Sequence, residues 1–394
     1  MLFLSMRITL SLIFTILTSF IYSQEVKSAY EVGLFSSLYL DQQFNESNEL
    51  INPRQISRNA IASLEFYEGA VLAIDSLNAS GKKINLTLFD VQSANGNISK
   101  AFEDGVFDRL DMIIAQVSGD DFFQLAIIAQ ELDIPIINAT YPNSKGLKEI
   151  PELFIVNPRI NTHLEVISKK INGNWKSGNI IWFRRENPAE KQLETLFKSI
   201  NAEIEKSNPP IKTVVLENEF EQADIQEFLD TLNSNIWILG SFEDAFAIKF
   251  LTTLQDINGK SKLNILGMPN METLKEIQSA KYRELPFYYT SAFHAPLESQ
   301  FIRNMNELFI STMGIRCPPM TLRGYEITYY FCSILAQYGK VKINQTETPK
   351  GFKILTDFDF SPVFLGKNSG QPDFYENRKI QIIRVLNGVA LPYF

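Results

Sequence analysis

Polar side chains follow two neighbouring apolar segments that the N-terminal half of the sequence predicts to be strands. Ser118 and Gly119 begin a predicted helix directly after one such strand, so their backbone N–H groups could receive a carboxylate. An ordinary helix N-cap without a ligand is the alternative. Asn138, Thr140 and Tyr141 follow the next strand along the chain. They either face the same crevice or only form the turn that ends this strand.

Charged residues occupy the corresponding positions in the C-terminal half. Arg184 and Arg185 end a predicted strand, and Glu243 begins a predicted helix after Gly240 and Ser241. Arg185 could pair with an acidic ligand, and Glu243 could hold an amine. As solvated charges at the edge of a sheet, both residues would need no ligand at all.

Residues typical of enzymes are scarce. His163 and His294 are the only histidines, and neither has a metal-ligand pattern nearby. The sequence has neither a G-x-S-x-G nucleophile motif nor a glycine-rich phosphate loop. We therefore expect no enzymatic activity, no metal and no cofactor.

The two cysteines are poorly placed for a disulfide. Cys332 lies about 16 Å along a helix that the sequence predicts to begin at Thr321, at roughly 1.5 Å per residue. Cys317 precedes that helix by a few residues, whereas bridged Cα atoms must approach within about 7 Å. We expect two buried or half-buried thiols.

The N-terminus has the pattern of an export signal. Arg7 is the only charged residue before Glu25, and an apolar core follows over Ile8–Tyr22. We expect cleavage after Ser23, so that residues 1–23 form a signal peptide; an uncleaved anchor is the alternative. The predicted location is the periplasm, without stable membrane insertion of the mature chain.

Charge argues against one class of partner. The net charge of the chain is −8, and loss of the leader with Arg7 makes it more negative. An acidic surface repels phosphate backbones, so we expect no nucleic-acid partner.

Strands and helices alternate along the rest of the 394 residues. The first predicted helix, Ser63–Leu77, has a broad apolar face formed by Leu64, Phe66, Tyr67 and others, with Gly69 on the polar side. The predicted strands are short and apolar on both faces, as in a parallel sheet covered by helices. The sequence therefore predicts an α/β fold with two doubly wound, parallel-sheet lobes.

Several short motifs follow one another along the chain. In the first half they are F-Y-E-G-A-V-L-A-I-D-S-L, Phe89-Asp90, I-I-A-Q-V-S-G-D-D and I-P-I-I-N. In the second half they are Pro318-Pro319, Gly324-Tyr325-Glu326 and Phe358-Asp359-Phe360, with Gly370 and Asn377 behind them. In this order the motifs resemble those of the type I periplasmic solute-binding proteins, a family that includes branched-chain amino-acid-binding proteins and receptor ligand-binding regions.

The resemblance implies two lobes joined by three crossings of the chain, with a ligand held in the cleft between them. Mapped onto this sequence, it implies a first lobe of residues 24–158 and 295–340 and a second lobe of residues 159–294 and 341–394. It also places Ser291 and Phe293 at the second crossing, as candidates to line the cleft. Proteins of this kind close over a ligand by a hinge motion.

The chain departs from the family pattern in both loops of the first lobe. Many members have Gly-Pro before the serine that contacts the ligand, whereas this chain has Ala115–Gly119. The second loop, often of P-x-S type, reads Asn138–Pro142. These changes keep hydroxyl and amide donors but leave specificity for amino acids open.

Two functions follow from the resemblance. The first is capture of a small polar ligand, of the amino-acid or small-carboxylate class, for an inner-membrane permease or a sensor. The second is a scaffold without a ligand that docks another cell-envelope protein, as activators of peptidoglycan synthases do with similar lobes. The altered loop Ala115–Gly119 and the long polar loop Asp41–Arg58 are the reasons for the second hypothesis.

Overall fold

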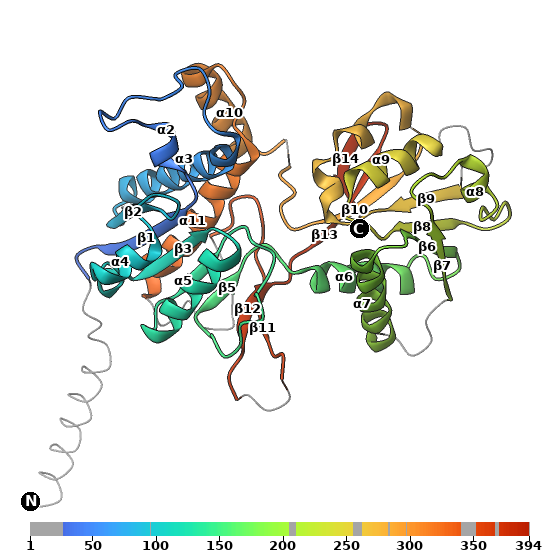
Figure 1. Ribbon diagram of the computed structural model, residues 1–394, viewed down its shortest axis with the longest axis horizontal. Helices are drawn as coiled ribbons and strands as arrows, with labels where there is room; N and C mark the ends of the chain where they lie inside the picture. Colours follow the sequence, from blue (N-terminus) through green and yellow to red (C-terminus); the bar gives the residue numbers. More distant parts are fainter. Residues whose placement is uncertain are drawn as a thin grey trace, which may run out of the picture.

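Two α/β lobes lie side by side in the computed structural model (Figure 1). The structure describes residues 27–94, 96–204, 210–254, 262–282, 284–296, 298–339, 352–366 and 370–393. The predicted signal peptide, residues 1–23, lies outside this part of the chain. Within the described residues, no helix has the length and apolar character needed to cross a membrane.

The sheet of the first lobe has the strand order β11-β12-β5-β4-β3-β1-β2. All neighbouring strands are parallel except the pair β11 and β12. The bounds are β1 Tyr30–Ser36, β2 Ile84–Asp90, β3 Met112–Gln116, β4 Ile136–Asn138, β5 Leu153–Ile155, β11 Phe360–Val363 and β12 Phe374–Asn377.

Helices cover both faces of this sheet (Figure 1). Alternate residues along each strand enter two separate cores: Leu34 packs with α3 and α11, whereas Phe35 packs with α4 and α5. The helices of this lobe are α2 Leu40–Gln43, α3 Arg58–Ala79, α4 Ile98–Glu103, α5 Gly119–Glu131, α10 Gln300–Met313 and α11 Pro319–Tyr338.

The prediction for the first helix is confirmed in position and wrong in one detail. Phe66 is fully buried, and Gly69, which the sequence analysis places on the polar side, is buried as well. A Cβ on Gly69 would lie 2.0 Å from the backbone oxygen of Thr321, and one on Gly324 would lie 2.1 Å from that of Phe66. The two glycines therefore let α3 and α11 approach backbone to backbone, which a pattern of apolar residues does not reveal.

The sheet of the second lobe has the order β14-β13-β10-β9-β8-β6-β7. The strands β6 to β10 are parallel, and β13 and β14 join them in antiparallel fashion. Their bounds are β6 Asn179–Arg185, β7 Ile211–Leu216, β8 Asn235–Leu239, β9 Leu263–Leu266, β10 Phe287–Ser291, β13 Gln381–Leu386 and β14 Val389–Pro392.

Helices again cover both faces of the second sheet, with α9 on one face and α6 and α7 on the other. Their bounds are α6 Ile160–Asn172, α7 Pro188–Ile204, α8 Gln222–Gln226 and α9 Asp244–Thr253. The apolar spacing of Met271–Ile277 predicts an α-helix, but the structure has two 3-10 segments there, Pro269–Thr273 and Lys275–Gln278. Met271 and Ile277 still pack into the core, so their apolar spacing reflects burial rather than an α-helix.

The chain passes between the lobes three times, and the third crossing differs from the expected one. Residues 341–394 were expected to lie wholly in the second lobe. Instead, β11 and β12 extend the first sheet, because Tyr375 of β12 pairs with Phe154 of β5. The third crossing therefore lies between Asn377 and Gln381.

Both cysteines are free thiols and both are buried, which confirms the expected burial. Burial raises the pKa of Cys317 to about 12, with a smaller contribution from Glu68 and Glu65, and it raises the pKa of Cys332 further.

Candidate functional site

The loop after β3 leaves the N-terminus of α5 open. Ser118 is exposed at the N-cap position, and its side chain makes no capping hydrogen bond. Gly119 begins the helix at φ 62°, a left-handed conformation that glycine adopts at little cost. Asp120 and Asp121 lie in the first turn. The backbone N–H groups are thus free to bind an acceptor, but an anion would also meet two carboxylates.

The loop after β4 uses most of its polar groups internally. Asn138 is fully buried; its Oδ1 accepts a hydrogen bond from the N–H of Tyr141 over 3.0 Å, and its Nδ2 donates to the Asn143 carbonyl over 3.2 Å. The Tyr141 ring packs edge-on against Phe122, with 5.6 Å between centroids. Asn138 therefore holds the turn together, whereas the hydroxyl of half-exposed Thr140 makes no hydrogen bond within the described part of the chain.

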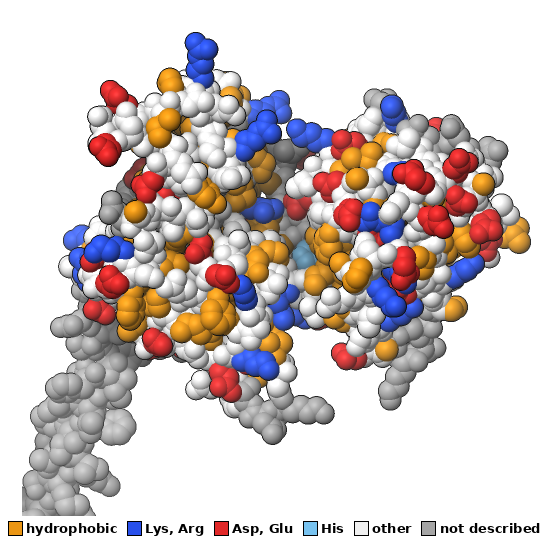
Figure 2. Space-filling view, in the orientation of Figure 1, with side chains coloured by type: hydrophobic (Ala, Val, Ile, Leu, Met, Phe, Trp, Pro, Cys, Tyr) orange, Lys and Arg blue, Asp and Glu red, His pale blue; other side chains and the backbone are white. Residues whose placement is uncertain are grey.

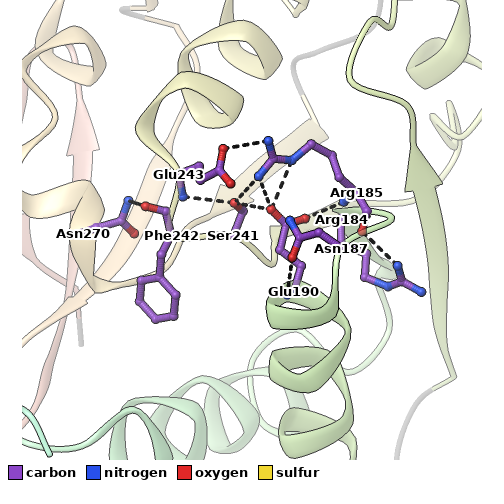
Figure 3. Close-up of polar contacts among 8 residues, drawn as sticks. All are labelled: Arg184, Arg185, Asn187, Glu190, Ser241, Phe242, Glu243 and Asn270. Atoms are coloured by element: carbon purple, nitrogen blue, oxygen red, sulfur yellow. Dashed lines mark hydrogen bonds and ion pairs between the residues drawn. The ribbon is translucent and has the colours of Figure 1, made fainter.

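Arg185 and Glu243, predicted from separate segments, contact each other in the second lobe (Figure 3). The Nη1 atom of Arg185 lies 2.8 Å from Oε2 of Glu243, and its Nη2 lies 3.4 Å from Oγ of Ser241. Glu190 binds the same guanidinium through Nε, over 3.1 Å, and through Nη2. The guanidinium also lies over the ring of Phe246, 4.9 Å from its centroid.

The two carboxylates on Arg185 differ in exposure. The side chain of Glu190 is 5% exposed, whereas that of Glu243 is 60% exposed. The hydrogen bond from Arg185 lowers the pKa of Glu243, and the same bond, with Glu190, raises the pKa of Arg185 against the effect of burial. Both groups are therefore charged at neutral pH. Glu190 fixes the arginine, and Arg185 can exchange Glu243 for another acceptor.

Arg184 points elsewhere (Figure 3). Its Nε atom donates to buried Glu194 over 2.6 Å, and its Nη1 contacts Glu186 over 3.1 Å. Phe242, between Ser241 and Glu243, is half exposed and its ring points away from the polar cluster (Figure 3). The cluster therefore has an aromatic side chain beside it that the sequence analysis did not select.

Ser291 and Phe293 lie at a contact between the lobes. Ser291 Oγ accepts a hydrogen bond from the N–H of Phe293 over 3.1 Å. Arg323 of α11 lies over the Phe293 ring, 4.3 Å from its centroid, and its Nη2 lies 3.8 Å from Oε2 of Glu272 in the second lobe. Burial raises the pKa of Glu272, and Arg323 and Ser291 oppose this rise.

Sequence reasoning missed Glu272 and Arg323. Glu272 follows the end of β9, so the rule that placed Glu243 after β8 could have found it. Arg323 lies inside a helix and has no such local signal. A furrow separates the lobes in this region of the molecule, with basic side chains along it (Figure 2).

No family model and no curated protein matches the sequence. Solved structures match nearly the whole chain. A putative branched-chain amino acid ABC transporter protein from Rhodospirillum rubrum is 12% identical, with a TM-score of 0.68 over 93% of this chain and 100% of the other. The leucine-binding protein LivK from Thermotoga maritima is 13% identical, with a TM-score of 0.54 over 93% and 98%. The chain has the type I periplasmic-binding-protein fold.

A structure that is not named as a transporter protein also shares this fold. LpoA from Haemophilus influenzae is 13% identical, with a TM-score of 0.55, and the match covers 94% of this chain and 60% of LpoA. At such identities the likeness concerns the type I fold alone. The role and the ligand therefore have to be argued from this chain's own residues.

Proposed function

We propose that this protein is an exported, non-enzymatic solute-binding protein that holds a small polar ligand between its two lobes in the periplasm. The ligand belongs to the amino-acid or small-carboxylate class, and it is passed to a transporter permease or a sensor. Ser118, Gly119 and Thr140 would contact it from the first lobe, and Arg185 and Glu243 from the second.

The pair Arg185–Glu243 carries the proposal. Arg185 is held in place by buried Glu190, and its second partner is an exposed carboxylate. A ligand carboxylate can replace Glu243 on the guanidinium without leaving a buried charge unpaired. The displaced Glu243 is then free to accept an ammonium group. A molecule that carries both charges therefore matches this pair better than a neutral solute does.

A thermal-shift screen of the mature protein against amino acids and small carboxylates tests the proposal. A ligand present at 100 times its Kd stabilises the fold by about 2.7 kcal/mol, which gives a clear shift in Tm. Glu243→Gln is expected to reduce the shift for amino acids and to leave the fold intact. Absence of any shift across both ligand classes would contradict the proposal.

Glu219→Gln is the matched control. Glu219 is an exposed carboxylate paired with Lys249, which itself lies over the ring of Phe220. The control thus removes the same kind of exposed ion pair, but from the loop after β7 and not from the loops after β6 and β8. An equal loss of ligand response in both variants would show that the effect is not specific to the cleft.

The second candidate function is a scaffold for another envelope protein. Its support is a group of exposed apolar side chains on one segment of the first lobe, from α2 to the start of α3: Leu40, Phe44, Leu50, Ile51, Ile56 and Ile61. Exposed apolar residues gathered in this way are typical of protein-binding surfaces.

Affinity capture from envelope extracts distinguishes the scaffold from the solute-binding protein. A stoichiometric partner that the double variant Ile51→Ser/Ile56→Ser loses, together with no ligand response, would favour the scaffold. A ligand response with no partner lost in the double variant would favour solute binding.

A further inference from the structure

A second cavity lies away from the strand-end loops. Its volume is about 600 Å³, which is within the usual range for small-molecule sites. Its walls are the C-terminal half of α6, the segment 353–357, the start of β13 and the end of β14. None of the residues that we assign to the inter-lobe site lines it.

Both lobes contribute to these walls. The segment 353–357 is attached to the first lobe, because the N–H groups of Leu355 and Thr356 donate to the carboxylate of Glu326 on α11. Helix α6 and strands β13 and β14 belong to the second lobe. A molecule in this cavity therefore touches both lobes beside the third crossing.

The charge on the cavity wall is strongly positive. Lys169, Lys170, Lys353 and Lys379 line it, and Asp357 is the one carboxylate among the lining residues. Within the described part of the chain, no ion pair joins any of these four lysines to a carboxylate. These lysines form a basic wall in a chain whose net charge is −8.

The Lys170 ammonium lies in an unfavourable electrostatic environment. It lies 4.1 Å from the ring centroid of Tyr393, and burial lowers its pKa. A cation–π contact offsets part of the lost hydration but supplies no counter-charge. An anion in the cavity would supply it, and it would also relieve the repulsion between lysines attached to different lobes.

We propose that this cavity is a binding site for a small polyvalent anion, with two or more phosphate or carboxylate groups, that bridges the two lobes at the hinge. Lys170 and Lys379 would bind its oxygens as charge-assisted donors, and Tyr393 would form an aromatic wall against its apolar part. The oxyanions could belong to a free metabolite or to a lipid headgroup, and the chemistry recognised is the same.

Isothermal titration of the mature protein with pyrophosphate and with citrate tests the site, at low and at moderate salt. We expect saturable binding that weakens with salt, since the contacts are between charges. The double variant Lys170→Gln/Lys379→Gln should lose at least about tenfold in affinity. Lys191→Gln, which removes an exposed lysine of α7 outside the cavity, should bind like the unaltered protein.

Co-sedimentation with phosphatidylglycerol vesicles distinguishes the two sources of the anion. Vesicle binding that the double variant loses assigns the oxyanions to a lipid headgroup, and binding of the soluble probes alone assigns them to a free metabolite. Absence of binding to probes and vesicles, or equal loss in the Lys191 control, overturns the proposal. The amino-acid response of the Arg185–Glu243 pair is measured separately, so either site can fail while the other stands.

Discussion

The carboxylate of Glu376 accepts a hydrogen bond from the backbone N–H of Arg159 over 2.7 Å and from its guanidinium over 2.8 Å. Thr162 donates to the same carboxylate over 3.0 Å, and Arg378 lies 3.6 Å away. Glu376 is fully buried at the end of β12, and Arg159 follows the first crossing. One side chain thus joins the first and third crossings of the chain.

Removing this charge should destabilise the hinge. Glu376→Gln leaves Arg159 and Arg378 without their shared counter-charge, and breaking a buried pair in this way costs about 3 kcal/mol. Urea unfolding checks the loss. Glu186→Gln is the control, because its pair with Arg184 involves a side chain that is 70% exposed, and such pairs contribute less than about 1 kcal/mol. Equal effects of the two substitutions would contradict the role of Glu376.

The close approach of α3 and α11 gives a second prediction. Gly324→Ala would place a Cβ 2.1 Å from the backbone oxygen of Phe66, so the helices must separate. We expect a loss of about 1–3 kcal/mol in the free energy of unfolding. In contrast, Gly370→Ala adds its methyl group where no atom lies within 4 Å, and it should be nearly neutral. Similar Tm values for both variants would show that α3 and α11 can move apart without loss of stability.

His163 should make stability depend on pH. It is buried under β10, with Nδ1 2.9 Å from Thr290 Oγ1, and burial lowers its pKa from 6.5 to about 4. The unfolded chain therefore binds more protons between pH 6.5 and 4, and the folded state loses stability as the pH falls through this range. The full difference is about 3 kcal/mol, at 1.36 kcal/mol for each pH unit.

Unfolding measured at several pH values checks this effect. His163→Gln should flatten the dependence between pH 6.5 and 4. His294→Gln should flatten it less, because His294 is only half buried, although burial lowers its pKa as well. An unchanged slope in the His163 variant would contradict the assignment.

The sequence was sufficient for the alternating elements and for the selection of Arg185 and Glu243, but it did not predict that these two residues pair with each other. Arg185 ends β6 and Glu243 follows β8, and parallel strands bring such positions to one edge of a sheet, so their contact agrees with the topology. The pattern missed three of the short strands. Strands β5, β12 and β14 have three or four residues each, which leaves little period to recognise, although the equally short β4 was predicted.

Side-chain pairing within the site was beyond sequence reasoning. The sequence left open whether Asn138 only forms its own turn, and nothing in the local sequence indicates that Glu190, in the first turn of α7, would bind Arg185 together with the exposed Glu243. The predicted position of the third crossing was wrong for a related reason. Its position depends on the pairing of β12 with β5. This long-range contact cannot be recognised from the spacing of hydrophobic residues.

The contact between Arg323 and Glu272 gives the last prediction, because it joins the lobes outside the three crossings. Arg323→Gln removes the cation from both Glu272 and the Phe293 ring, which leaves the lobes with one attraction fewer. We expect a larger radius of gyration in small-angle scattering of the ligand-free protein, with a loss of stability of only about 1 kcal/mol. Arg303→Gln is the control, since Arg303 bonds only within and just before α10. Scattering curves that coincide for both variants and the unaltered protein would show that this pair does not hold the lobes together.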